Sequence, residues 1–104
     1  MKKISIIIPT LFEEELLGNL LVQFTQKLRE QYDFEVIVSD GGSKDKTIEI
    51  AKQFADKVVE NTSGVKQNIS QGRNNGADVA SGENFVFLNA DCMPDNFSNG
   101  VRKE

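Results

Sequence analysis

The chain has 104 residues, a net charge of −4, one cysteine and no histidine. This length suits one small domain, and the acidic balance argues against nucleic acid as a partner. A single cysteine excludes an intramolecular disulfide and favours a reducing compartment, so we expect a cytoplasmic protein, held at the cytoplasmic membrane face if a longer form is anchored. Metal sites built on Cys and His are excluded, and no segment approaches the roughly 20 apolar residues of a membrane span.

Four short apolar segments predict β-strands, in chain order at residues 4–8, 35–38, 57–60 and 84–89. The first is a β-branched run, Ile4–Ile8, closed by Pro9, as expected for a strand buried on both faces. The last is apolar through its middle, which also favours a buried strand.

The segments between the strands carry apolar residues at helical spacing. The first runs from an acidic start at Glu13–Glu15 to Leu28, and we expect one continuous helix there. Ser43 is expected to cap the second helix, whose predicted buried face comprises Thr47, Ile50, Ala51, Phe54 and Ala55. The third helix is expected over residues 66–80, with Gly82 as its C-terminal stop and a small inner face of Ile69, Gly72, Gly76, Ala77 and Ala80.

This alternation predicts an α/β fold, a Rossmann-like βαβαβαβ three-layer sandwich with a mostly parallel sheet. Ligands of such sheets bind beyond the carboxyl ends of the strands, where residues 9–13, 40–43 and 89–91 would meet. The chain has neither a G-x-G-x-x-G nor a G-x-x-x-x-G-K-[ST] segment, so a dinucleotide site and a P-loop are unsupported. A receiver domain would need an acidic pair after the first strand, where this chain has Pro9-Thr10.

Four motifs in order carry a resemblance. They are the opening strand through Pro9-Thr10 with Glu13-Glu14 after it, the segment 38–47, the segment 72–77, and the stretch from residue 81 to Asn89-Ala90-Asp91. Together they resemble the motifs of family 2 glycosyltransferases with the GT-A fold, and they cover nearly the whole chain. The resemblance implies that residues 1–91 form the N-terminal nucleotide-sugar-binding domain. Residues 92–104 would be a polar tail that begins an acceptor half absent from this sequence.

The resemblance also implies roles for single residues. Asp40 would hydrogen-bond the nucleobase, typically uracil, and Asp91 would hold a divalent cation, Mn²⁺ or Mg²⁺, that bridges the donor phosphates. The other nucleotide-binding positions would be Pro9, Thr10, Glu13, Gly41, Arg73, Asn89 and Ala90. Asn89 departs from the acidic first position of the family's Asp-x-Asp motif and removes one negative charge from the expected metal site.

Each assignment has a structural alternative. Asp40 can serve an Asp-Gly turn, Glu13 can be a helix N-terminal charge, Arg73 can be a solvated helix residue, and Asp91 can belong to a polar loop. A purely structural role at a helix entry is expected for Ser43, Asp45 and Thr47. Cys92 is expected to pack rather than to act as a nucleophile, because no histidine is present to activate it.

The family reaction is inverting transfer of a sugar from a nucleotide donor, and it requires a carboxylate base. No residue of this chain is assigned as that base, so we expect donor binding, to a UDP-sugar above all, with little or no transferase activity. The alternative is a non-catalytic domain that serves assembly or partner binding. A nucleotidyltransferase is disfavoured, because the segment after the first strand is acidic. Uncovered apolar surface and an open strand edge predict a homo-oligomer, most simply a dimer.

Overall fold

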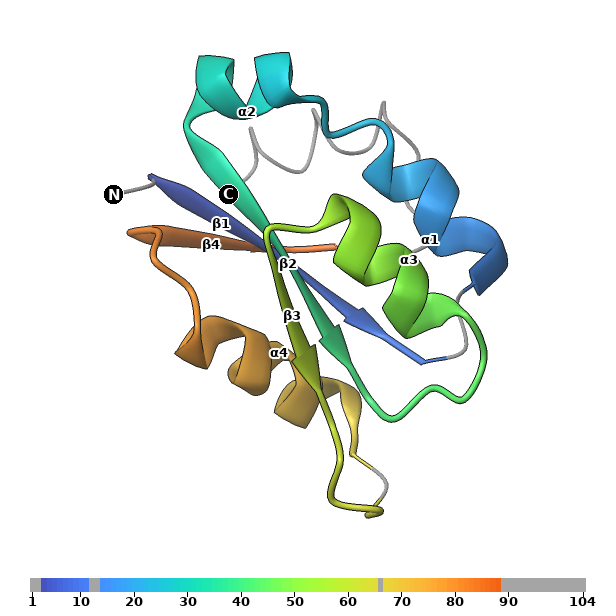
Figure 1. Cartoon of the computed structure of the whole chain (residues 1–104). Helices are drawn as coiled ribbons and strands as arrows, with labels where there is room; N and C mark the ends of the chain where they lie inside the picture. Colours follow the sequence, from blue (N-terminus) through green and yellow to red (C-terminus); the bar gives the residue numbers. More distant parts are fainter. Residues whose placement is uncertain (1–2, 12–13, 66, 89–104) are drawn as a thin grey trace.

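The computed structural model describes residues 3–11, 14–65 and 67–88 (Figure 1). Within these ranges one or two α-helices separate each β-strand from the next. In chain order they are β1 (Ile4–Thr10), α1 (Glu14–Leu21), α2 (Gln26–Tyr32), β2 (Phe34–Asp40), α3 (Thr47–Phe54), β3 (Lys57–Glu60), α4 (Ile69–Asp78) and β4 (Asn84–Phe87). No helix within these ranges has the length and apolar content that a membrane crossing requires.

The strands form one parallel sheet in the order β3-β2-β1-β4. β1 is therefore central, and Ile4 is in register with Phe34 of β2 on one side and with Asn84 of β4 on the other. The predicted α/β fold with a parallel sheet is confirmed. β1 and β2 are longer than predicted and extend to Thr10 and Asp40. These two residues therefore lie side by side at the carboxyl ends of neighbouring strands.

Helices cover both faces of the sheet, with α1 and α3 on one side and α4 on the other (Figure 1). The face under α1 and α3 holds the main apolar core, which comprises Ile6, Ile8, Leu17, Leu20, Leu21, Phe24, Phe34, Val36, Val38, Ala51, Val86 and Leu88. α4 packs on β1 and β2 through small residues. A methyl group added at Gly76 would lie 2.5 Å from Ile7 Cγ2, so only glycine allows this approach.

The prediction of one continuous first helix was wrong. α1 ends at Leu21 and α2 starts at Gln26, because Thr25 caps α2 by accepting a hydrogen bond from the Leu28 N–H at 3.2 Å. A threonine that satisfies the backbone in this way favours a helix start over a helix interior. The break also buries Phe24 edge-on to Phe34, with the ring centroids 5.8 Å apart.

Two other helix-end predictions also differ from the structure. Ser43 does not cap α3, which begins only at Thr47. α4 is shorter than expected, since a capping box between Asn68 and Gln71 starts it at Ile69. Gly82 lies beyond the end of α4 and instead donates its N–H to Ser5 Oγ at 2.8 Å.

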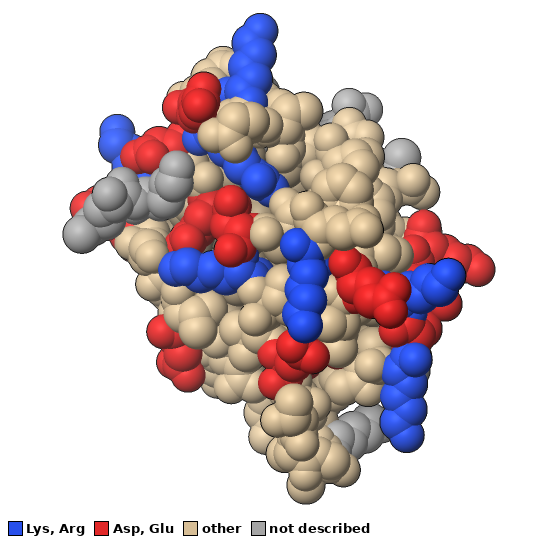
Figure 2. Space-filling model, viewed as in Figure 1, with Lys and Arg blue, Asp and Glu red and all other residues tan. Residues whose placement is uncertain are grey.

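β4 lies at one edge of the described sheet and has β1 as its neighbour there. Its side chains Phe85 and Phe87 are 39% and 40% exposed. The expected uncovered apolar surface is therefore present in the described residues, and self-association through it stays a prediction. The face of the molecule in Figure 2 carries charges of both signs interspersed. One of the ion pairs of the chain joins Lys52 and Glu60 at 3.3 Å.

A buried carboxylate, that of Glu35, links several segments near the amino-terminal ends of β1 and β2. Glu35 is 4% exposed and accepts hydrogen bonds from Ser5 Oγ at 2.7 Å and from the Ser81 N–H at 2.6 Å. Lys57 Nζ lies 3.2 Å from its other oxygen. Burial alone would raise the pKa of Glu35, but the Ser81 N–H, the Ser5 hydroxyl and the Lys57 ammonium together outweigh burial and lower it.

We expect Glu35→Gln to reduce the free energy of unfolding by about 1 to 3 kcal/mol at neutral pH. Because the folded pKa lies below the unfolded one, this contribution is complete above the unfolded pKa and is lost as the pH falls through the folded value. Urea unfolding of both proteins at pH 7 and at successively lower pH measures this. The difference in unfolding free energy between wild type and Glu35→Gln should become smaller as the pH falls. The exposed control Glu83→Gln should differ little from wild type at any pH. An equal loss at neutral and acid pH would contradict this role for Glu35.

Candidate functional site

In the strand order β3-β2-β1-β4, β2 and β3 lie on one side of β1 and β4 lies on the other. The order of the strands therefore reverses at β1, and the carboxyl ends of β1 and β2 lie beside this topological switch point. Thr10 and Asp40 are register partners there, and Thr10 Oγ1 donates to Asp40 Oδ1 at 2.8 Å. Pro9 is half-buried on the side that faces α4, 3.4 Å from where a methyl group on Gly72 would lie. The structure thus brings Pro9, Thr10, Asp40 and Gly41 together, as predicted from their sequence positions.

Asp40 is 1% exposed, and its carboxylate accepts four hydrogen bonds from within the chain. Besides Thr10, the donors are the Gly42 N–H at 2.8 Å, the Ser43 N–H at 2.7 Å and the Ser43 hydroxyl at 2.7 Å. A carboxylate offers about four lone-pair positions, so these bonds use its full capacity. Asp40 therefore holds the turn at residues 41–43 against the end of β1, which is the structural role weighed above.

The two glycines after Asp40 have different reasons to be glycine. Gly42 has a φ of 112°, a conformation that residues with a side chain rarely adopt. Gly41 donates its N–H to Thr10 O at 2.8 Å, and a methyl group on it would lie 3.5 Å from Gln67 Nε2. The backbone at Gly41 thus leaves room for a side chain from the segment before α4.

Asp45 links the starts of α3 and α1. Its carboxylate accepts the Thr47 N–H at 3.0 Å and the Thr47 hydroxyl. The hydrogen bond from the Thr47 side chain, joined by those from the Thr47 and Glu14 backbone, lowers the pKa of Asp45 despite some desolvation. These contacts support the expected structural role of Asp45 and Thr47.

Arg73 lies on the side of α4 that faces β4. Its guanidinium carbon is 5.5 Å from the centre of the Phe87 ring, a cation–π geometry. Its Nε is buried and has no hydrogen-bond partner among the described residues. The structure therefore places the Arg73 guanidinium beside Phe87 of β4.

Four predicted site residues, Glu13, Asn89, Ala90 and Asp91, lie outside the described residues, as does Cys92. Their proposed contacts with nucleotide or metal stay predictions. Within residues 3–11, 14–65 and 67–88 there is no group of three or more carboxylate, His or Cys side chains with the arrangement of a metal site. The metal prediction thus rests on Asp91.

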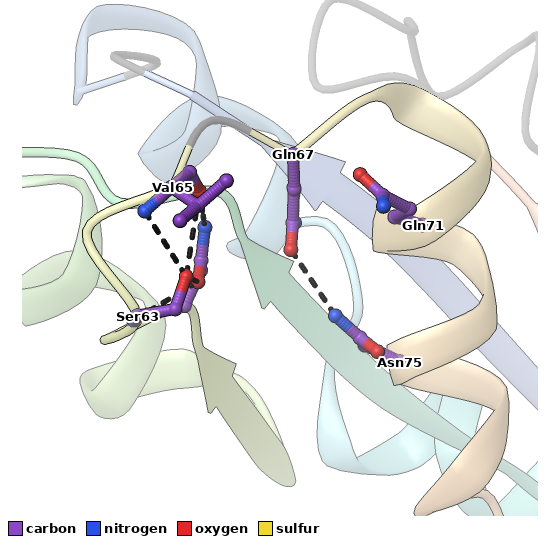
Figure 3. Close-up of a pocket in the computed structure, with 6 residues that line it drawn as sticks. Ser63, Val65, Gln67, Gln71 and Asn75 are labelled. Atoms are coloured by element: carbon purple, nitrogen blue, oxygen red, sulfur yellow. Dashed lines mark hydrogen bonds between the residues drawn. The ribbon is translucent and has the colours of Figure 1, made fainter.

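A polar pocket that the sequence did not predict lies beside the turn that follows Asp40 (Figure 3). Its volume is about 220 Å³, and it is lined by Asn61, Ser63, Val65, Gln67, Gln71 and Asn75. Asn75 Nδ2 donates to Gln67 Oε1 at 3.1 Å, and Asn61 Nδ2 donates to Gly41 O at 3.2 Å, which joins the pocket to the Asp40 turn. The available sequence signal was the recurrence of amide side chains every four residues at positions 67, 71 and 75.

Comparisons with known proteins indicate the family to which the chain is related. The family model described as glycosyl transferase family 2 matches residues 5–96. The chain is 36% identical over 95 residues to glycosyltransferase AglE of Haloferax volcanii, a match that covers 88% of this chain and 31% of AglE.

Solved structures show the same arrangement of elements. Mannosyl-3-phosphoglycerate synthase from Rubrobacter xylanophilus superposes with a TM-score of 0.75 over 90% of this chain and 33% of the synthase, at 17% identity, which bears on the fold alone. Glucosyl-3-phosphoglycerate synthase from Mycobacterium tuberculosis, in a crystal with Mn²⁺, uridine diphosphate and glucosyl-3-phosphoglycerate, superposes with a TM-score of 0.70 at 25% identity. That match covers 88% of this chain and 34% of the synthase.

The chain spans about a third of the length of AglE and of each synthase. The fold is the α/β arrangement of GT-A glycosyltransferases that was predicted from the sequence. With the family model matched over residues 5–96, the chain belongs to glycosyltransferase family 2.

Proposed function

We propose that this chain binds the nucleotide-sugar donor of a glycosyltransferase, and that the donor is a UDP-linked sugar. The observation that carries the proposal is the similarity to the M. tuberculosis synthase, whose crystal contains uridine diphosphate and Mn²⁺. The position of the Asp40 turn and of Thr10 at the switch point of the sheet supports it.

In this proposal the site has two parts. The ends of β1 and β2, with Pro9, Thr10 and Gly41, form the wall against which the nucleoside lies, and Asp40 keeps that wall in place. Residues 89–91, which follow β4 in the sequence, contact the ribose and the diphosphate, with Asp91 as the metal ligand. A hard divalent cation suits a carboxylate ligand. When bound, it would offset the charge that develops on the departing diphosphate.

We further propose that sugar transfer requires residues beyond these 104. In an inverting transfer, the acceptor hydroxyl oxygen forms the new bond to the anomeric carbon, and the bond from that carbon to the diphosphate oxygen breaks. The hydroxyl proton passes to a carboxylate base. Among the described carboxylates near the site, Asp40 and Asp45 are occupied by internal hydrogen bonds, so neither is suited to that task.

Calorimetric titration of the chain with UDP, with and without Mn²⁺, tests donor binding. We expect UDP to bind more tightly with Mn²⁺ than without it, and more tightly than ADP or GDP. Asp91→Ala should lower the affinity for UDP in Mn²⁺ by tenfold or more, about 1.4 kcal/mol or more, and should change the affinity without metal much less.

One result would overturn the whole proposal, and another would overturn its metal part alone. If a folded chain binds none of the three nucleotides, the non-catalytic alternative, a domain that keeps the fold for assembly, takes its place. If UDP binds equally well with and without Mn²⁺, and Asp91→Ala changes nothing, the metal part of the proposal is wrong while donor binding stands.

A further inference from the structure

Lys57, the first residue of β3, holds the connection between α4 and β4. Its Nζ donates to the backbone carbonyl of Val79 at 2.6 Å and to Ser81 Oγ at 2.8 Å. The same ammonium lies 3.2 Å from Oε1 of Glu35, whose other oxygen accepts the Ser81 N–H at 2.6 Å. Val79 is the C-terminal cap of α4, and a positive charge at the carboxyl end of a helix is favourable. Lys57 and Glu35 therefore fix the place where α4 ends.

The start of β4 is held near the same end of the sheet. The Gly82 N–H donates to Ser5 Oγ of β1 at 2.8 Å, and the N–H groups of Glu83 and Asn84 donate to Lys3 O at 3.1 and 3.0 Å. These contacts lie near the amino-terminal end of β1, whereas the candidate donor site lies at the carboxyl end of that strand. The segment that joins α4 to β4 is therefore fixed at both of its ends.

The position of the Arg73 guanidinium depends on how α4 and β4 are placed relative to each other. Arg73 belongs to α4, and its guanidinium carbon lies 5.5 Å from the centre of the ring of Phe87 in β4. Its Nε is buried and has no hydrogen-bond partner among the described residues. α4 meets the strands through Gly72 and Gly76, which allow a close approach but have no side chains to interlock with the sheet. A small shift of α4 would therefore move the guanidinium away from the ring.

Building on the donor site proposed above, for which Arg73 is a predicted nucleotide-binding residue, we propose that Lys57 is a positioning residue for Arg73. Lys57 fixes the end of α4, and this keeps the Arg73 guanidinium against Phe87. The contacts of Lys57 with Glu35, Val79 and Ser81 lie away from the strand ends where the donor would bind, so Lys57 acts on the donor through α4. Rigid secondary-structure elements can carry coupling of this kind.

The first test is the nuclear magnetic resonance signal of the Arg73 side chain. Protons held over the face of an aromatic ring are shifted upfield, so the Arg73 side-chain protons should show this shift in the wild-type chain and lose it in Phe87→Leu. Lys57→Met removes the ammonium and should move the Arg73 signals most of the way toward their positions in Phe87→Leu. Lys57→Arg keeps a positive charge and several donors, so it should retain the wild-type signals.

Titration of the full chain with UDP in the presence of Mn²⁺ measures the consequence for the donor. We expect Lys57→Met to lower the affinity for UDP by about threefold to tenfold. In a double-mutant cycle, the same change should have little further effect once Arg73→Gln has removed the guanidinium. If Lys57 served the stability of the fold alone, the Arg73 signals of folded Lys57→Met would not move.

Lys52→Met is the matched control, because it removes the same charge from another ion pair, that with Glu60 at 3.3 Å. It should change neither the Arg73 signals nor the affinity for UDP. Thermal unfolding of each variant establishes that it is folded. Should Lys57→Met not fold, Ser81→Ala removes one acceptor of the ammonium and should move the Arg73 signals in the same direction by a smaller amount.

Two results would contradict the role of Lys57. One is a folded Lys57→Met chain whose Arg73 signals stay at their wild-type positions. The other is a loss of UDP affinity that is equally large with arginine and with glutamine at position 73. If the wild-type chain binds no UDP, the donor-binding proposal fails, while the Arg73 signals still decide whether Lys57 positions this side chain.

Discussion

Replacing Asp40 by alanine is expected to lower the free energy of unfolding by about 3 to 5 kcal/mol. The change leaves the Thr10 hydroxyl, the Gly42 and Ser43 N–H groups and the Ser43 hydroxyl without their acceptor in a region with almost no solvent contact. A domain of this size has a total stability of about 5 to 15 kcal/mol, so the variant should unfold in far less urea. Urea titration followed by circular dichroism measures the effect.

Two further variants separate the contributions. Asp40→Asn keeps one acceptor oxygen and should lose less than the alanine variant, while Thr10→Val removes a single donor and should cost about 1 kcal/mol. A loss below about 1 kcal/mol for Asp40→Ala would show that the four bonds are not formed in solution. A large loss also affects any binding experiment, since weaker UDP binding by Asp40→Ala would not by itself establish a contact with the base.

Gly82→Ala should destabilise the fold by about 2 to 3 kcal/mol. The added methyl group would lie 2.7 Å from the backbone carbon of Ile4 and from the backbone nitrogen of Ser5, and 2.5 Å from Ser5 Oγ. Backbone atoms of a central strand cannot move aside as a flexible side chain can. The Gly82 N–H would also be pushed from its 2.8 Å hydrogen bond with Ser5 Oγ.

Gly18→Ala is the matched control, because a methyl group there meets nothing closer than Ile50 Cγ2 at 3.7 Å. Gly18 lies inside α1, so alanine should stabilise the chain by about 0.5 to 1 kcal/mol through helix propensity. Thermal unfolding midpoints should therefore move in opposite directions for the two variants. Gly82→Ala with a wild-type midpoint would indicate that the segment before β4 does not pack on β1 as described.

The strands were the most predictable part of the fold. The apolar runs that become β1 and β2 are short, β-branched and buried along nearly their whole length, a pattern that helices rarely show. The predicted strands were too short: β1 also includes Pro9 and Thr10, and β2 also includes Phe34, Ser39 and Asp40. A proline and polar side chains at the end of a strand look like loop. Pairing in the sheet is what extends the strands to those residues.

Helix ends were less predictable, because side-chain hydrogen bonds decide them. The leucine spacing runs through residue 28 without a break, yet Thr25 starts a new helix by capping it. Ser43 has the sequence position of a cap but bonds to Asp40 instead. Both outcomes depend on which acceptor or donor the folded chain brings within reach, and a linear pattern does not contain that information.

The sequence predicted where the candidate site lies, but not which hydrogen bonds its residues make. Motif order and the strand-end rule identified Thr10, Asp40 and Gly41 as neighbours, which the structure bears out. Neither indicated that the Asp40 carboxylate would accept four hydrogen bonds from groups of the chain itself. The polar pocket beside Gln67 and Asn75 was missed because glutamine and asparagine in a loop and on a helix resemble any solvated surface. It is the Asn75–Gln67 hydrogen bond across the turn of the chain that gives them a common face.

The central position of β1 has a consequence for how the chain reaches this structure. One neighbour of β1 follows within about thirty residues, since Ile4 aligns with Phe34, whereas the other pairing joins Ile4 to Asn84 near the end of the described chain. A chain emerging from the ribosome can form the β1–β2 pair early but must wait for most of its length before the second side of β1 closes. Such distant pairing raises contact order and slows folding. Until it is complete, one whole edge of the central strand is available to other chains, which makes the nascent state the one most exposed to aggregation.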